Sequence, residues 1–206
     1  IAEIFTTLGV DEVLSGGQTM NPSTEDIAGV VRRIPADHVY ILPNNSNIIM
    51  AARQVQELIE DKQIHVIPSK SIPQGISALL SFNPEGSLED NSEGMESSLS
   101  KVRSGEVTYA VRDSQFAGIR IAAGDVLGLV EGTIVSNGQD LLSVAQETLE
   151  KMDLAQSELV TIFYGQDVDA SATEELVQWL NENHTQVEVE IHAGEQPIYY
   201  YIFSVE

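Results

Sequence analysis

The chain of 206 residues contains no cysteine, and basic residues are scarce. The absence of cysteine excludes disulfide bonds, thiolate metal ligands and a cysteine nucleophile. Ten lysine and arginine residues stand against 32 acidic ones, which gives a formal net charge of −22. A field of this sign repels nucleic-acid phosphates and anionic lipid surfaces, so we expect neither class of partner. A basic protein surface would instead be attracted.

The acidic residues are unevenly distributed along the chain. Residues 1–120 hold nine basic and sixteen acidic residues, whereas residues 121–206 hold sixteen acidic residues and a single basic one, Lys151. Two explanations of this acidity stay open, namely solubility and attraction of a basic partner.

Long hydrophobic runs are also lacking. No apolar run approaches the roughly 20 residues that cross a bilayer, and the chain does not begin with a basic segment followed by a short apolar one. With 42% hydrophobic and 20% charged residues, the composition is that of a globular protein. We therefore expect a cytoplasmic protein without membrane insertion. Because the first residue is Ile1 and helical spacing begins immediately, we expect a fragment of a longer protein.

Short β-branched runs alternate with helical segments in the first half. This alternation is typical of βαβ units that form a parallel sheet covered by helices. For the first long helix, the sequence leaves two N-caps open: Asn21 followed by Pro22, or Ser23 with Asp26 three residues later. We expect strands over residues 12–15, 38–42 and 64–67, and helices over about 22–33, 48–59, 77–82 and 88–102.

The residue pattern changes after Gly105. Val107, Tyr109 and Val111 alternate with less apolar residues, which predicts a strand with one solvent-exposed side. Glycines then separate short apolar pieces, as in an antiparallel meander. Beyond them we expect helices over 141–152 and 172–183, a strand over 159–164 and a strand pair within 187–205. The predicted fold class is α/β, with a parallel α/β half and bridging helix (1–103) followed by an acidic α+β half with mixed or antiparallel strands (104–206).

Polar turns follow the predicted strands of the first half. Gly16 and Gly17 predict a tight turn before a helix. Such a turn either binds an anion through backbone amides or is only a tight turn with a cap, and here it lacks the lysine of a phosphate-binding loop. The side-chain amides of Asn44 and Asn45 are expected either to hydrogen-bond a carboxylate or to cap the next helix. The candidate binding residues of the whole chain are Gly16, Gly17, Gln18, Thr19, Asn44, Asn45, His192 and Gln196.

The four histidines are dispersed, so we expect no metal site. His192 is the best candidate for a functional histidine because Gly194 and Pro197 predict a bent loop after it, although no nucleophile lies beside it in the sequence. Tyr199, Tyr200, Tyr201 and Phe203 form an aromatic segment in which one strand face is expected in the core and the other at a partner surface. No catalytic residue is assigned.

Several segments together resemble the C-terminal domain of the fatty acid kinase A subunit, a family whose N-terminal region is of the dihydroxyacetone-kinase type. They are GGQTMNPSTED at 16–26, LPNN at 42–45, IPQG at 72–75, GEVTYAVRD at 105–113 and IHAGEQP at 191–197. In that family an N-terminal domain binds ATP and magnesium, a middle domain contributes active-site residues, and the C-terminal domain engages a fatty-acid-carrying B protein. The resemblance implies a domain without cofactor or catalytic site. Its implied partners are the B protein and the remaining kinase domains, with a homodimer as a further option.

The chain also resembles the DegV-type lipid binders to which the B proteins belong, which implies a DegV-like two-part fold. Two departures stand at the loops that would hold a fatty-acid carboxylate. Asn44 and Asn45 replace a Ser/Thr-rich loop, and Glu195 to Pro197 replace a Thr-Gly-Pro-Gly-like turn. A carboxylate next to Glu195 would meet like charge. The resemblance therefore favours a docking domain, with a lipid carrier as the alternative; a free-standing phosphotransfer enzyme ranks last.

Overall fold

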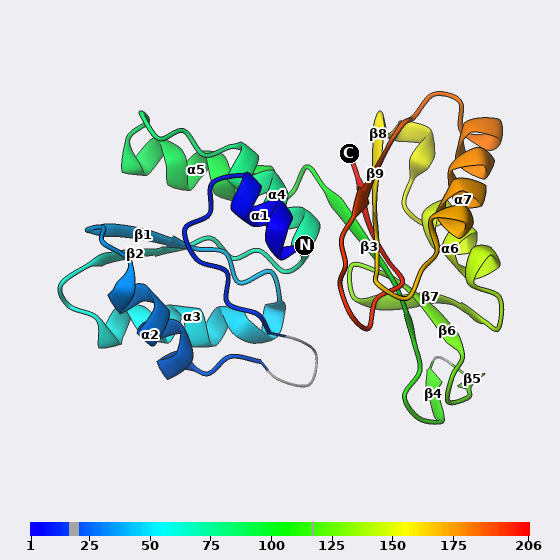
Figure 1. The fold of residues 1–206 in the computed structure, drawn as a ribbon, viewed down its shortest axis with the longest axis horizontal. Helices are drawn as coiled ribbons and strands as arrows, with labels where there is room; N and C mark the ends of the chain where they lie inside the picture. Colours follow the sequence, from blue (N-terminus) through cyan, green and yellow to red (C-terminus); the bar gives the residue numbers. More distant parts are fainter. Residues whose placement is uncertain (17–20, 117) are drawn as a thin grey trace. The chain divides into compact units, whose positions relative to one another are not determined.

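The computed structural model describes residues 1–16, 21–116 and 118–206, which divide into two compact units (Figure 1). The N-terminal unit is Ala2–Val102, and the C-terminal unit is Arg103–Glu206 together with Ile1. Within the described ranges, no helix combines the length and the apolar character that crossing a membrane requires.

The N-terminal unit is built around a small parallel sheet. Strands β1 and β2 pair in register, with His38 opposite Gln63 and Ile41 opposite Val66. Helices α2 and α3 pack on one face of this sheet and α4 and α5 on the other (Figure 1). The elements are α1 (Ala2–Thr7), α2 (Thr24–Arg33), β1 (His38–Ile41), α3 (Ser46–Leu58), β2 (Gln63–Val66), α4 (Ile72–Leu80) and α5 (Leu88–Ser98).

Alternate residues of β1 point into two separate apolar clusters. Val39 packs with Ile27 of α2 and Val55 of α3, whereas Tyr40 packs against the cluster that contains Met95 of α5. A strand buried on both faces is expected where helices cover both sides of a parallel sheet. The βαβ arrangement predicted from the sequence is therefore confirmed for β1, α3 and β2.

The prediction of a strand over residues 12–15 is wrong. Residues 11–16 are outside any helix or strand, and all of them are exposed. A short apolar run needs a neighbouring strand to satisfy its backbone groups, and none pairs with it in the described part of the unit. The sheet consequently has two strands, so two strand ends face one way rather than three.

The start of α2 decides between the two predicted caps. Ser23 is the N-cap: its hydroxyl accepts a hydrogen bond from Asp26 N (3.1 Å), and Ser23 N donates to Asp26 Oδ2 (2.9 Å). This reciprocal pair satisfies two backbone donors of the first helical turn. The hydrogen bonds from the Ser23 side chain and backbone lower the pKa of the Asp26 carboxyl.

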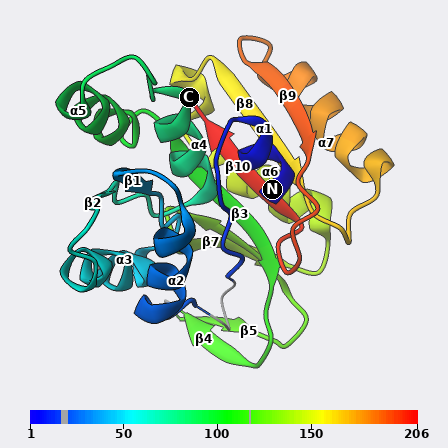
Figure 2. The same ribbon diagram turned by 60° about the vertical axis from the view of Figure 1, so that its left-hand side comes forward.

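The C-terminal unit contains a six-stranded sheet in the order β7-β6-β3-β10-β8-β9, with helices α6 and α7 packed on one face (Figure 2). Only β8 and β9 are parallel, joined through α7; all other neighbours are antiparallel. The elements are β3 (Arg103–Tyr109), β4 (Ser114–Phe116), β5 (Ile119–Ile121), β6 (Val126–Val130), β7 (Thr133–Gly138), α6 (Leu141–Glu150), the 3-10 turn η1 (Leu154–Gln156), β8 (Leu159–Tyr164), α7 (Ala170–Asn183), β9 (Glu188–Ala193) and β10 (Tyr201–Val205).

Two expectations about this sheet are wrong. The last two strands do not pair with each other, because β8 lies between them and β10 bonds to β3 and β8. Strand β3 has no solvent-exposed side over most of its length, since Val107 and Thr108 are both buried. Both errors have one cause: β3 and β10 are internal strands whose partners lie far away in the sequence.

Aromatic residues near the end of the chain are buried rather than presented to solvent. All five residues of β10 are buried, including Tyr201 and Phe203, whose rings stack with centroids 5.6 Å apart. Burial raises the pKa of Tyr201. The partner surface expected on one face of this segment is therefore wrong for Tyr201 to Val205.

Candidate functional site

The glycine motif at residues 16–26 lies partly outside the described residues. Gly16 is exposed and outside any helix or strand. Gly17, Gln18 and Thr19 lie outside the described residues. Helix α2, which follows the motif, is capped by Ser23, whose side chain accepts a hydrogen bond from a backbone N–H of the first turn.

The turn after β1 is tied to the turn after β2 by a reciprocal pair of hydrogen bonds. Asn44 N donates to Ser69 Oγ (3.0 Å), and Ser69 Oγ donates to Asn44 Oδ1 (2.7 Å). Asn44 adopts a left-handed backbone with φ of 54°, a conformation that asparagine tolerates better than most residues. Ser69 has no exposed surface, so this pair is part of the interior of the N-terminal unit.

The first turn of α4 closes the same cluster. Lys70 N donates to Gln74 Oε1 (2.8 Å), and the N-cap Ser71 accepts from Gln74 N (3.3 Å). Gly75 lies against the Asn44 side chain so closely that an added Cβ would overlap the Asn44 amide. Glycine is therefore the residue that lets α4 approach the Asn44 turn.

Asn45 has a separate task from Asn44. It is the N-cap of α3, and its side-chain oxygen accepts from Asn47 N (2.9 Å). The sequence left binding and capping open for both asparagines; the geometry assigns capping to Asn45 and a link between two loops to Asn44. Ser69, Gln74 and Gly75 were missed as members of this cluster. The repeated polar turn before residue 76 was the signal that could have found them.

The second candidate loop follows β9 in the C-terminal unit. Gln196 Nε2 donates to the carbonyl oxygen of Phe163 (2.9 Å), and Gln196 Oε1 is buried without a hydrogen-bond partner among the described residues. Glu195 and Ile198 both have positive φ, at 52° and 74°. The strained loop is thus anchored to β8 and carries one unused acceptor.

His192 lies on β9 just before this loop. Its ring stacks on Phe163 with centroids 5.6 Å apart, and its Nε2 is 3.6 Å from Glu190 Oε2. About half of the side chain is exposed. Among the described residues no hydroxyl is hydrogen-bonded to the ring, and the chain has no cysteine, so the geometry supports no nucleophilic pair.

Two further titratable groups have shifted pKa values. Burial, and then the charge of His38, lower the pKa of His65 on β2, whose ring stacks on Tyr40. Burial, and then the charge of Glu131, raise the pKa of Glu106 on β3. Over the described ranges, no group of three or more His, Asp or Glu side chains is arranged to hold a metal ion.

The candidate residues thus form two sets. Asn44 and Asn45 belong to the N-terminal unit with Ser69, Gln74 and Gly75, whereas His192 and Gln196 belong to the C-terminal unit. The first set offers a neutral hydroxyl and amides, and the second an imidazole and an amide. Neutral donors of this kind bind carboxylates or carbonyls by hydrogen bonding rather than by charge.

Comparison with known proteins decides the family. The family of fatty acid kinase A-like C-terminal domains matches residues 1–206. The chain belongs to this family. It is 48% identical over 206 residues to Protein YloV of Bacillus subtilis, and the match covers 100% of the chain but only 37% of YloV. This fatty acid kinase A-like domain therefore spans about a third of the length of that relative.

Solved structures show the fold of the A-like domain. It resembles the DegV family protein Cg2579 of Corynebacterium glutamicum, with a TM-score of 0.69, 14% identity and coverage of 100% and 93% of the two chains. It also resembles the fatty acid kinase B3 protein of Streptococcus pneumoniae, solved with linoleic acid, with a TM-score of 0.61, 16% identity and coverage of 90% and 76%. The dihydroxyacetone kinase of C. freundii shares the fold at a TM-score of 0.58, 9% identity and coverage of 90% and 42%. The DegV-like fold predicted from the sequence is confirmed.

Proposed function

We propose that this A-like domain docks a DegV-family B protein in the cytoplasm and presents its bound fatty acid to a kinase centre in other domains of the parent protein. The fatty acid would there be phosphorylated to an acyl-phosphate. The observation that carries this proposal is the family match over all of residues 1–206. ATP and magnesium would be held by the N-terminal domain of the parent, and this chain would supply no catalytic residue.

The polar loops support docking over catalysis. Asn44, Asn45 and Ser69 use their side chains on one another or on helix caps, which leaves little capacity for a reacting group. His192 faces a carboxylate instead of a nucleophile. These contacts stabilise the loops, as expected of a domain that acts by binding a partner and not by catalysis.

Charge supports a partner with a basic face. Residues 103–206 contain four basic and eighteen acidic residues. Glu174 and Glu175 of α7 are exposed members of this set. Such a field accelerates the encounter with a basic surface and is screened by salt.

Biolayer interferometry between this chain and a fatty-acid-loaded B protein tests the proposal. We expect saturable binding whose association rate falls about tenfold between low and high salt. Glu174→Lys with Glu175→Lys should slow association, whereas Glu85→Lys with Glu89→Lys, exposed in the N-terminal unit, serves as the matched control. Absence of binding even at low ionic strength would refute docking.

The alternative is a lipid-binding domain in its own right. It is favoured by the fold shared with DegV proteins solved as fatty-acid binders and by the buried, unpaired Gln196 Oε1. A fatty acid in its protonated form could donate to that oxygen, but Glu195 beside it disfavours a carboxylate. Native mass spectrometry distinguishes the two: a carrier purifies with acyl chains, whereas a docking domain purifies empty.

A further inference from the structure

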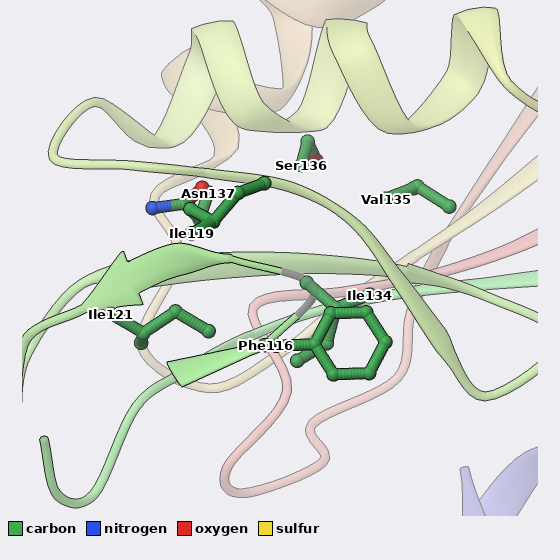
Figure 3. Close-up of a pocket in the computed structure, with 7 residues that line it drawn as sticks. All are labelled: Phe116, Ile119, Ile121, Ile134, Val135, Ser136 and Asn137. Atoms are coloured by element: carbon green, nitrogen blue, oxygen red, sulfur yellow. The ribbon is translucent and has the colours of Figure 1, made fainter. Parts of the chain in front are cut away.

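The six-stranded sheet of the C-terminal unit ends in two strands, β7 and β9, whose outer edges differ. Strand β7 carries a bulge, because Ser136 and Ile134 pair with consecutive residues of β6 and leave Val135 without a partner there. The hairpin β4–β5 lies beside β7, and residues of both line an apolar hollow of about 60 Å³ (Figure 3). Bulges and covering segments are common means by which an edge strand is kept from pairing further.

Strand β9 has no bulge and no further strand on its outer side in the described part of the chain (Figure 2). It pairs with β8 over six consecutive residues without a register shift, from Glu188 opposite Leu159 to Ala193 opposite Tyr164. All of its residues are exposed except Val189, which is partly buried. The outer edge of β9 is therefore regular and open to a further strand.

The hydrogen bonds to β8 indicate which backbone groups of β9 remain free. Glu188 N donates to Glu158 O (2.8 Å), and Gly194 N donates to Tyr164 O (2.9 Å). In a regular parallel ladder every second residue bonds to the neighbouring strand, so the residues between these two positions alternate between the β8 side and the outer side. The residues whose N–H and C=O groups point outward are Val189, Ile191 and Ala193. Among the described residues these groups have no backbone hydrogen-bond partner.

The side chains of β9 define the kind of strand that fits this edge. Glu188 and Glu190 are exposed on one face of the sheet, and Ile191, 42% exposed, lies on the other. Glu188 makes no ion pair with any described residue, and Glu190 faces only His192, at 3.6 Å. A strand with Lys or Arg at alternate positions would bring opposite charges to the two glutamates, and its intervening apolar residues would pack on Ile191.

The same charges disfavour a second copy of the chain as the added strand. A copy paired antiparallel along β9 would bring its own Glu188 and Glu190 to the face that already carries these two glutamates. Like charges on neighbouring strands repel. The edge is therefore selective for a basic strand, which is the charge that a chain with a net charge of −22 attracts.

We propose that the β9 edge, defined as the outward backbone of Val189, Ile191 and Ala193 with the carboxylates of Glu188 and Glu190, receives an extended basic segment of the B protein as an added strand. The edge is thereby the surface of the docking function proposed above, on which the inference rests. Main-chain hydrogen bonds to the outward N–H and C=O groups supply the affinity, and the alternation of basic and apolar side chains supplies the specificity.

The backbone amides of β9 give the direct test. Hydrogen exchange measured by NMR, on the 206-residue chain with and without a fatty-acid-loaded B protein, resolves each N–H of the strand. Exchange at the outward amides of Val189, Ile191 and Ala193 should slow at least about tenfold in the complex, because these groups become hydrogen-bonded. The amides of Glu190 and His192 face β8, so they should change less and serve as the internal control.

Proline separates backbone pairing from side-chain contact. Ile191→Pro removes an outward N–H that the sheet does not use, at an edge position that tolerates proline, and should raise the dissociation constant at least about tenfold. Ile191→Ala keeps the N–H and should raise it about threefold at most. Glu188→Gln with Glu190→Gln should raise it about three- to tenfold at low salt and less at high salt. Glu85→Gln with Glu89→Gln, exposed in the N-terminal unit, is the matched control and should have far less effect.

Failure of the edge contact and failure of docking give different results. If the B protein binds but the outward amides stay unprotected, or if Ile191→Pro binds as tightly as Ile191→Ala, the edge proposal is overturned while docking stands. If the B protein does not bind the unaltered chain at all, docking is refuted and the edge proposal with it. Circular dichroism verifies that Ile191→Pro is folded. Where it is not, the exchange measurement and the glutamine variant, which keep the backbone of β9 unaltered, decide the outcome.

Discussion

Both units cover a sheet with helices, but they differ in how far apart in the sequence the paired strands lie. In the N-terminal unit β1 and β2 are joined by the single helix α3, and neighbouring elements in sequence are neighbours in space. In the C-terminal unit β10 pairs with β3, about a hundred residues earlier in the chain. The sheet of the C-terminal unit therefore forms from contacts between segments that are distant in the sequence. The sheet of the N-terminal unit forms from segments that short connections join.

The position of polar residues differs in the same way. Asn44, Ser69 and Gln74 lie at the turns that follow β1 and β2, where they connect loops. In the C-terminal unit Ser136 and Thr148 hydrogen-bond within the core (2.9 Å), and Gln196 is buried against β8. Polar side chains link loops in one unit and lie in the core of the other, so we expect substitutions in the two units to change stability by different amounts.

The largest expected effect is a cavity in the C-terminal core. Leu176 of α7 has no exposed surface, and Leu176→Ala should lower the free energy of unfolding by about 2–5 kcal/mol. Trp179, the single tryptophan of the chain, packs against this core, so its fluorescence follows the unfolding of this unit in urea. Leu58→Ala, at a 51% exposed position of α3, is the control and should change stability by less than about 0.5 kcal/mol. Equal effects of the two would contradict the assigned core.

Two glycines, Gly75 in helix α4 and Gly165 just after strand β8, test which unit tolerates crowding better. A Cβ on Gly165 would overlap the carbonyl oxygen of Tyr199, a backbone atom, whereas a Cβ on Gly75 would overlap the Asn44 side chain. Gly165→Ala should therefore cost about 2–4 kcal/mol and Gly75→Ala about 1–2 kcal/mol, since a side chain shifts more easily than a backbone. Thermal unfolding followed by circular dichroism measures both. The reverse order would mean that the Asn44 turn is the more rigid of the two.

Removal of one hydroxyl tests the link between the loops of the N-terminal unit. Ser69→Ala leaves Asn44 N and Asn44 Oδ1 without their partner in a buried setting, which should cost about 1–3 kcal/mol. Ser100→Ala, whose exposed hydroxyl donates to Ser97 O, is the matched control with an expected change near zero. Urea unfolding of both variants gives the difference. A loss no greater than that of the control would show that the two turns hold their geometry without this pair.

Local signals in the sequence were sufficient where the structure is local. Ser23 with Asp26 is one of the two N-caps that the sequence left open and is the one found, and the strand Leu159–Tyr164 lies where it was predicted. The pairing of β9 and β10 was wrong because strand order depends on contacts between distant segments, which periodicity does not encode. The short run over residues 12–15 was wrong for the same reason: a strand needs a partner as well as β-branched residues.

The candidate sites show the same limit. Polar turns after strands predicted the Asn44 loop, since turn residues have local preferences. Ser69 and Gly75 were missed because their importance arises from the approach of α4 to the turn after β1, a contact between separate segments. The unpaired Gln196 Oε1 could not be predicted either, because burial of a side chain depends on the packing of β8 against the last loop.

The smallest expected effect concerns pH, and it differs in sign between the units. The pKa of His65 is lowered in the fold, so its contribution to stability is present above its ordinary value of 6.5 and is lost as the pH falls through the lowered pKa. The pKa of Glu106 is raised, so its contribution is present below the ordinary value of 4.5 and is lost as the pH rises through the raised pKa. Between these limits, acidification should weaken the N-terminal unit and strengthen the C-terminal one.

Amide hydrogen exchange of β1–β2 and of β3–β10, measured by NMR from about pH 7 to about pH 5, reports the two units separately. His65→Gln should flatten the pH dependence of the first set without affecting the second, and Glu106→Gln should do the reverse. His184→Gln, whose imidazole is near Glu150 at 3.2 Å, controls for the loss of a histidine elsewhere. Parallel changes in both sets would show that the units open together, because only separately opening units can carry opposite pH responses.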